Sequence, residues 1–97
     1  DSFVINCARG GIVDEAALMS ALDIDAIAGA GIDVYETEPP PADHPFLKSN
    51  KIFLSQHSAG VSVEAARRMS LETANNLVGA LTGEINPATL ANPEVVG

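Results

Sequence analysis

Apolar residues gather into three short runs separated by polar and turn-forming segments. The runs are Ser2–Asn6, Ile27–Val34 and Lys51–Ser55. Near-continuous apolar runs of this length are typical of parallel strands covered on both faces. Gly29 and Gly31 are unfavourable inside an ordinary strand and indicate that another backbone or a ligand packs close to the second run.

The segment between the first two runs predicts a short helix. Asp14 is a suitable N-cap, and Glu15 lies in the first turn, where the helix dipole favours negative charge. Apolar residues between Ala16 and Leu22 supply one face, and the polar stretch 23–25 ends the helix. A strand, a helix and a strand within about 30 residues predict a right-handed βαβ unit.

A long loop and a second helix follow. Residues 36–50 hold four of the six prolines and show no hydrophobic period, so we expect a loop, and long loops are often functional. Ser62 is suited to cap a helix from about Val63 to Leu81, and Gly83 is suited to end it. The tail 84–97 contains two prolines and is expected to be irregular.

Composition narrows the class of protein. The net charge of −8 and a pI near 4.3 argue against nucleic acid or an anionic membrane as a partner. No apolar stretch approaches the ~20 residues of a membrane span. A single cysteine excludes an internal disulfide and a Cys-rich metal site, so we predict no metal and expect a reducing cytoplasm. The sequence does not begin with Met, and it predicts two helices, whereas a parallel sheet needs helices on both of its faces. We therefore expect the chain to be a fragment.

Each apolar run ends just before a residue that can carry acid–base or carboxylate chemistry. Arg9 follows the first run, Glu38 the second and His57 the third. The carboxyl ends of neighbouring parallel strands share the edge at which open α/β sheets bind ligands, so we expect the three residues to gather there. His57 is suited to act as a general acid or base, and the alternative is that it is a hydrogen-bonded loop histidine. Arg9 is suited to bind a substrate carboxylate, and the alternative is that it lies at the surface or caps the C-terminal end of a helix.

Two acids compete for the role of orienting His57. Glu38 or Glu36 could stabilise its protonated imidazole, and either could instead be a solvated loop acid. The residues alone leave this choice open. His44, in the same loop, is a weaker candidate for chemistry.

The remaining candidates depend on their partners. Asp33, near the end of an apolar run, requires a hydrogen-bond donor such as a backbone N–H or a ligand amide. Cys7 has no neighbouring base and is expected to be a small packed residue. The sequence contains neither GxGxxG nor GxxxxGK, so no phosphate-binding motif indicates a nucleotide.

Three segments together nevertheless resemble a known family. INCARGGIVDEAAL, AGAGIDVYETEP and HSAG resemble the nucleotide-binding domain of D-isomer-specific 2-hydroxyacid dehydrogenases, which include phosphoglycerate dehydrogenase, glyoxylate/hydroxypyruvate reductase and D-lactate dehydrogenase. The resemblance covers Phe3 to about Ala80. It implies an α/β fold, the C-terminal portion of a Rossmann-like doubly wound parallel sheet ending in a long helix. Residues 1–83 would be the C-terminal half of the NAD(P)-binding domain, and residues 84–97 a tail.

The resemblance also implies a role for each candidate. Arg9 would bind the substrate carboxylate and carbonyl, Glu38 rather than Glu36 would partner His57, and His57 would donate the proton when a 2-oxo acid is reduced. Asp33 would bind the nicotinamide carboxamide. NAD or NADP would supply the hydride. The implied cofactor-binding set is Cys7, Ala8, Arg9, Asp33, His57, Ser58, Ala59 and Gly60.

The implied activity is the interconversion of small D-2-hydroxy acids and 2-oxo acids by a cytoplasmic homodimer, without nucleic acid or membrane partners. The alternative is a co-repressor-like interaction protein of the same fold that senses dinucleotides. Two departures from the family stand out. Gln56 replaces the usual proline before His57, which could loosen that loop. The GxGxxG turn and the substrate-binding domain are absent, so we expect the isolated chain to be inactive.

Overall fold

A computed structural model describes residues 1–96, which divide after Gly60 into two compact units. The first unit contains β1 (Phe3–Asn6), α1 (Glu15–Asp23), β2 (Gly29–Ile32), a 3₁₀ helix (Pro45–Lys48) and β3 (Ile52–Leu54). The second unit contains α2 (Val63–Thr82) and two further 3₁₀ turns, Pro87–Thr89 and Pro93–Val96.

The three strands form one parallel sheet in the order β1-β2-β3. Val4 is paired with Ala30, and Ala30 with Ile52, so the strands run in register. Each strand is shorter than its apolar run, but all three predicted strands are present. Their carboxyl ends therefore lie along one edge of the sheet, as the sequence predicts.

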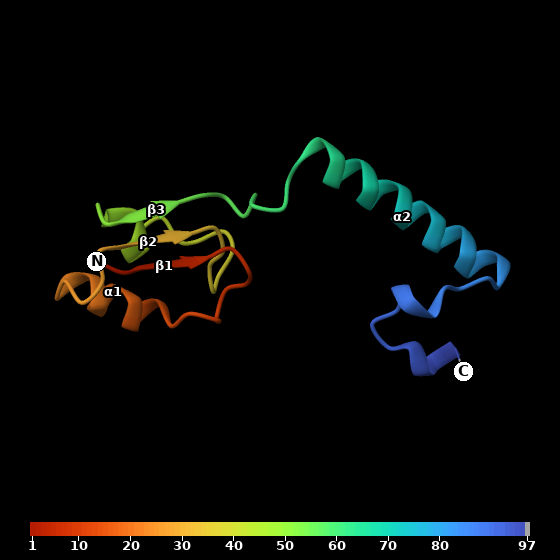
Figure 1. Cartoon of the computed structure of the whole chain (residues 1–97), viewed down its shortest axis with the longest axis horizontal. Helices are drawn as coiled ribbons and strands as arrows, with labels where there is room; N and C mark the ends of the chain where they lie inside the picture. Colours follow the sequence, from red (N-terminus) through yellow and green to blue (C-terminus); the bar gives the residue numbers. More distant parts are fainter. Residues whose placement is uncertain (97) are drawn as a thin grey trace. The chain divides into compact units, whose positions relative to one another are not determined.

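Helix α1 covers one face of this sheet and forms the core with it (Figure 1). The Asp14 carboxylate caps the helix by accepting the Ala17 N–H at 2.9 Å, which satisfies a donor that has no partner within the helix. Leu18 and Leu22 are buried against the sheet, beside Ile32. The N-cap and the apolar face thus act as the sequence predicts.

The opposite face of the sheet is apolar and exposed within the first unit. Phe3, Ile5 and Phe53 are 69%, 73% and 82% exposed. A Cβ built on Gly29 would lie 3.1 Å from the Phe3 ring and 3.0 Å from the Lys51 carbonyl oxygen. The close approach predicted at Gly29 therefore comes from the chain itself.

The predicted loop 36–50 is not entirely irregular. Pro45–Lys48 forms a 3₁₀ helix, capped by the ring of His44, which accepts the Phe46 N–H at 3.2 Å. Phe46 is 1% exposed and belongs to the core cluster. One anchoring aromatic creates no hydrophobic period, which is why the pattern does not predict this element.

The second unit begins with α2, whose predicted ends are close to those observed. Ser62 accepts the Ala65 N–H, and Gly83 ends the helix in the left-handed conformation. No residue of α2 is buried. The tail is not wholly irregular, because prolines at 87 and 93 open short 3₁₀ turns. Among the described residues, no helix has the length and apolar content needed to cross a membrane.

Candidate functional site

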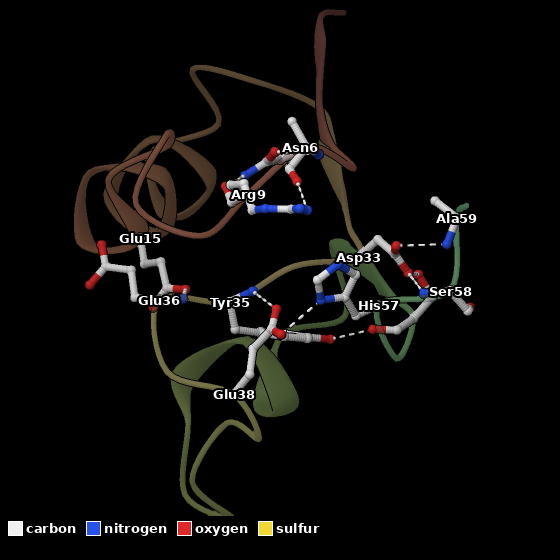
Figure 2. A network of polar contacts seen from close by, with 12 residues as sticks. Asn6, Arg9, Glu15, Asp33, Tyr35, Glu36, Glu38, His57, Ser58 and Ala59 are labelled. Carbon is white, nitrogen blue, oxygen red and sulfur yellow. Dashed lines mark hydrogen bonds and ion pairs between the residues drawn. The ribbon is translucent and has the colours of Figure 1, made fainter. Parts of the chain in front are cut away.

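Glu38 and His57 meet at the carboxyl edge of the sheet (Figure 2). The His57 Nδ1 lies 2.7 Å from Glu38 Oε2, and the Tyr35 N–H donates to Glu38 Oε1 at 3.0 Å. Both oxygens of the Glu38 carboxylate are therefore engaged. Glu36, the other candidate acid, uses its backbone N–H to contact Glu15 instead.

The surroundings favour the ionised form of Glu38. The hydrogen bond with His57 lowers the pKa of Glu38 most, followed by the Tyr35 N–H, with a smaller contribution from the positive charge of Arg9. A carboxylate can only accept hydrogen bonds, so Nδ1 of His57 carries a proton and donates this hydrogen bond to Glu38. The side chains of Glu38 and His57 are 37% and 43% exposed, which leaves the pair open to a ligand.

Arg9 is carried by a tight turn after β1. The buried Asn6 side chain accepts the Ala8 N–H at 3.1 Å and donates to the Arg9 carbonyl oxygen at 2.9 Å. The exposed Arg9 guanidinium donates to the Ala8 carbonyl oxygen. A Cβ built on Gly10 would lie 1.9 Å from the Tyr35 carbonyl oxygen, so glycine lets this turn pack against the segment leading to Glu38.

Asp33 anchors the loop that carries His57. Its Oδ1 accepts from the Ser55 hydroxyl and, at 2.9 Å, from the Ser58 N–H, and its Oδ2 accepts from the Ala59 N–H at 2.8 Å. These hydrogen bonds, the one from Ser55 first, lower the pKa of Asp33 to about 2. His57 itself has a φ of 58°, a left-handed conformation that few residues other than glycine adopt. The hydrogen bonds from Ser58 and Ala59, the two residues after His57, to Asp33 hold this conformation.

Comparison with known proteins identifies the family. The family model described as "D-isomer specific 2-hydroxyacid dehydrogenase, NAD binding domain" matches residues 1–59. The chain belongs to the D-isomer-specific 2-hydroxyacid dehydrogenases. A glyoxylate reductase from Thermofilum pendens is 45% identical over 95 residues, which are 98% of this chain and 28% of that protein.

Solved structures agree with this assignment. An NADPH-dependent glyoxylate/hydroxypyruvate reductase from Sinorhizobium meliloti, in complex with NADP and malonate, is 42% identical, with a TM-score of 0.71 over 79% of this chain and 24% of that one. An NAD-dependent formate dehydrogenase from Staphylococcus aureus, in complex with NAD, is 32% identical, with a TM-score of 0.80 over 88% of this chain and 26% of that one. The predicted Rossmann-like α/β fold is confirmed.

The chain spans little more than a quarter of the Thermofilum relative's length. The matched part is the family's NAD-binding domain, so the predicted nicotinamide dinucleotide cofactor is confirmed as a class. The implied cofactor residues lie on the turns after β1 and β3 and directly after β2. The turn after β1 holds Cys7, Ala8 and Arg9, and Asp33 directly follows β2. The turn after β3 holds His57, Ser58, Ala59 and Gly60.

One expectation in this turn is wrong. Cys7 is exposed rather than packed, because β1 ends at Asn6 and the chain turns there, so that the buried position belongs to Asn6. Within residues 1–96, no group of three or more His, Cys, Asp or Glu side chains could hold a metal ion.

The sequence reasoning missed two residues that build the site. Asn6 is a polar residue at the end of an apolar run, which is the signal that could have indicated its role. Tyr35 is 8% exposed, donates its N–H to Glu38, and donates its hydroxyl to the Ser55 carbonyl oxygen at 2.8 Å. Tyr35 thereby links the segment after β2 to the end of β3.

Proposed function

We propose that the protein carrying this chain is an NAD(P)-dependent oxidoreductase that interconverts D-2-hydroxy acids and 2-oxo acids. The observation that carries the proposal is the 2.7 Å contact between Glu38 and His57, close enough to Arg9 for the guanidinium charge to act on Glu38. A general acid or base beside a carboxylate-binding arginine is the set of groups that this reaction requires. The names of the related reductases support the same substrate class.

Arg9 and His57 have complementary tasks in this proposal. The planar guanidinium of Arg9 binds the substrate carboxylate through paired hydrogen bonds. His57 holds its Nδ1 proton toward Glu38, which leaves Nε2 to give a proton to the carbonyl oxygen during reduction and to take it back during oxidation. The ionised Glu38 stabilises the imidazolium and fixes the ring orientation.

The residues at this edge also fit a nicotinamide group. Within residues 1–96, Asp33 Oδ2 accepts one hydrogen bond, from the Ala59 N–H, and keeps an acceptor position for a carboxamide N–H. A Cβ built on Gly60 would meet no atom within 4 Å, so the turn after His57 leaves space beside the backbone. When bound, the nicotinamide supplies a hydride to the keto carbon, or takes one from the hydroxy acid. The related structures hold NADP and NAD respectively, and we propose either for this chain.

Replacing His57 by Ala in the intact protein should reduce turnover of glyoxylate or hydroxypyruvate by ~10²–10⁴, because the proton donor is removed. Glu38→Gln should also lower turnover, whereas Glu36→Gln, two positions away, is the matched control and should leave it near wild type. The measurement is steady-state oxidation of NADH or NADPH. A His57→Ala enzyme with wild-type turnover would exclude the proposed mechanism. Dinucleotide binding without any turnover in the wild type would favour the sensing alternative.

We further propose that residues 1–83 form the C-terminal half of the NAD(P)-binding domain, with 84–97 as its tail, in a cytoplasmic homodimer. The 97 residues alone should then bind NAD weakly and lack dehydrogenase activity, because their sequence contains no GxGxxG turn to hold the pyrophosphate. Calorimetric titration of the isolated chain with NAD tests this expectation. Tight binding would contradict it.

A further inference from the structure

Glu15 and His44 form a second acid–histidine pair that the proposed reaction does not use. His44 Nε2 lies 2.9 Å from Glu15 Oε2, and the two side chains are 12% and 19% exposed. This pair is more enclosed than Glu38 and His57, at 37% and 43%. It joins the first residue of α1 to the loop between β2 and β3.

The hydrogen bonds determine which nitrogen of His44 carries the proton. His44 Nδ1 accepts the Phe46 N–H at 3.2 Å, so the neutral ring has its proton on Nε2 and donates it to Glu15. Phe46 is buried, and its ring packs edge-on against the imidazole at 4.8 Å between centroids. The core therefore holds His44, and His44 holds one oxygen of Glu15.

The other oxygen of Glu15 reaches the segment that carries Glu38. Glu15 Oε1 accepts the Glu36 N–H at 2.9 Å, and the preceding N–H, that of Tyr35, donates to Glu38 Oε1 at 3.0 Å. Figure 2 shows this series of carboxylates and backbone donors from Glu15 to His57. Two consecutive backbone donors are thus bound by two carboxylates, one from α1 and one from the site.

We propose that Glu15 and His44 are positioning residues: the pair fixes the backbone at Tyr35 and Glu36 and so holds Glu38 against Nδ1 of His57. The inference rests on the proposed roles of Glu38 and His57. A different role would be that His44 only caps the 3₁₀ helix Pro45–Lys48 through Phe46. The two roles use different ring nitrogens, so they can be separated by substitution.

Two amide side chains each imitate one nitrogen of His44. His44→Gln places an N–H donor where Nε2 lies, so it keeps the contact with Glu15 and loses the acceptor for Phe46. His44→Asn places an acceptor where Nδ1 lies, so it keeps the cap and loses Glu15. Glu15→Ala removes the link from the side of α1 and leaves the sequence of the loop unchanged. Glu36→Ala is the control, because the proposed contact uses the backbone N–H of Glu36 and not its side chain.

The readout is the pair of imidazole ¹⁵N chemical shifts of His57 in the full 97-residue chain, recorded by NMR at a pH where the ring is neutral. In the wild type these shifts should indicate a proton on Nδ1, which Glu38 accepts. His44→Asn and Glu15→Ala should move both shifts toward the free-histidine mixture, in which Nε2–H predominates. His44→Gln and Glu36→Ala should leave them at wild-type values.

Unchanged His57 shifts in Glu15→Ala or His44→Asn would overturn the proposal, and so would a change in His44→Gln as large as that in His44→Asn. Backbone amide spectra report whether each variant folds, and Glu15→Ala keeps the test decisive if a His44 variant does not. Because the ring is observed directly, a failure here is distinct from a failure of the proposed activity, which the turnover of His57→Ala decides.

Discussion

At the scale of single residues, His57 depends on an acid beneath its loop. Asp33 is 2% exposed, and it accepts the N–H groups of the two residues that follow His57. Because His57 has a positive φ, its backbone costs free energy that surrounding contacts must offset. Asp33 supplies contacts of that kind, and strained backbone of this type is frequent at active sites.

The ionisation of Asp33 should make the stability of this loop depend on pH. Its pKa falls from 3.8 to about 2 on folding, so the folded state binds fewer protons. The contribution to stability is therefore complete above the unfolded value and is lost as the pH falls through the folded value. Urea unfolding of wild type and Asp33→Asn should differ most at roughly pH 6 and converge near pH 2. A difference that is the same at both pH values would contradict this account.

Arg9 should be sensitive to the shape of its charged group. Arg9→Lys keeps the positive charge and loses the planar fork, so the KM for the 2-oxo acid should rise by roughly 10–100-fold in the intact protein, the cost of about one charged hydrogen bond. Arg67→Lys, on α2, is the matched control and should have the wild-type KM. Steady-state kinetics with varied substrate measure both. Equal KM values for the two variants would show that Arg9 does not bind the substrate carboxylate.

At the scale of elements, the turn after β1 and the segment after β2 pack backbone against backbone. Gly10 makes this possible, since a Cβ there would overlap the Tyr35 carbonyl group. Neither backbone can move without displacing Arg9 or Glu38. The packing of these elements therefore determines the spacing of the site.

Substitution of Gly10 should reveal this constraint. Gly10→Ala should reduce the free energy of unfolding by about 1–3 kcal/mol, the range for overpacking, because the atom it meets is backbone. Gly60→Ala is the matched control, since a Cβ there meets nothing within 4 Å. Urea unfolding monitored by circular dichroism gives both values. Equal stability of the two variants would show that the turn can relax.

At the scale of the whole molecule, the two units differ in how much they bury. The first unit has a core built around Leu18, Leu22 and Phe46, whereas α2 in the second has no buried residue. Stability within a protein follows such differences in burial. The proposed site residues all belong to the first unit, which contains the core that positions them.

Hydrogen exchange should therefore separate the units. Amides of β2, which pair with strands on both sides, should be the slowest to exchange in the 97-residue chain. Amides of α2 should exchange through local opening and much faster than the amides of β2, because packing contributes little to the stability of that helix. Mass spectrometry after a series of labelling times measures both. Protection of α2 equal to that of β2 would contradict the prediction.

Much of this architecture follows from local properties of the sequence. Apolar runs and N-capping residues predict three strands and two helices, because these signals act over a few neighbouring residues. Strand polarity then predicts that Arg9, Glu38 and His57 reach one edge, since parallel strands end on the same side. The family resemblance adds a role for each of them.

The family resemblance implied that Glu38 partners His57, but the residues alone left that choice open, and the tertiary structure decided which groups touch. Glu38 rather than Glu36 faces His57, Asp33 anchors the loop of His57, and Glu15 joins His44 across 29 positions. These contacts join groups 19 to 29 residues apart, and their geometry depends on where the packed backbone places each atom. Local pattern carries no information on such distances. The sequence alone therefore determined the elements and the edge at which chemistry gathers, and packing determined the partners.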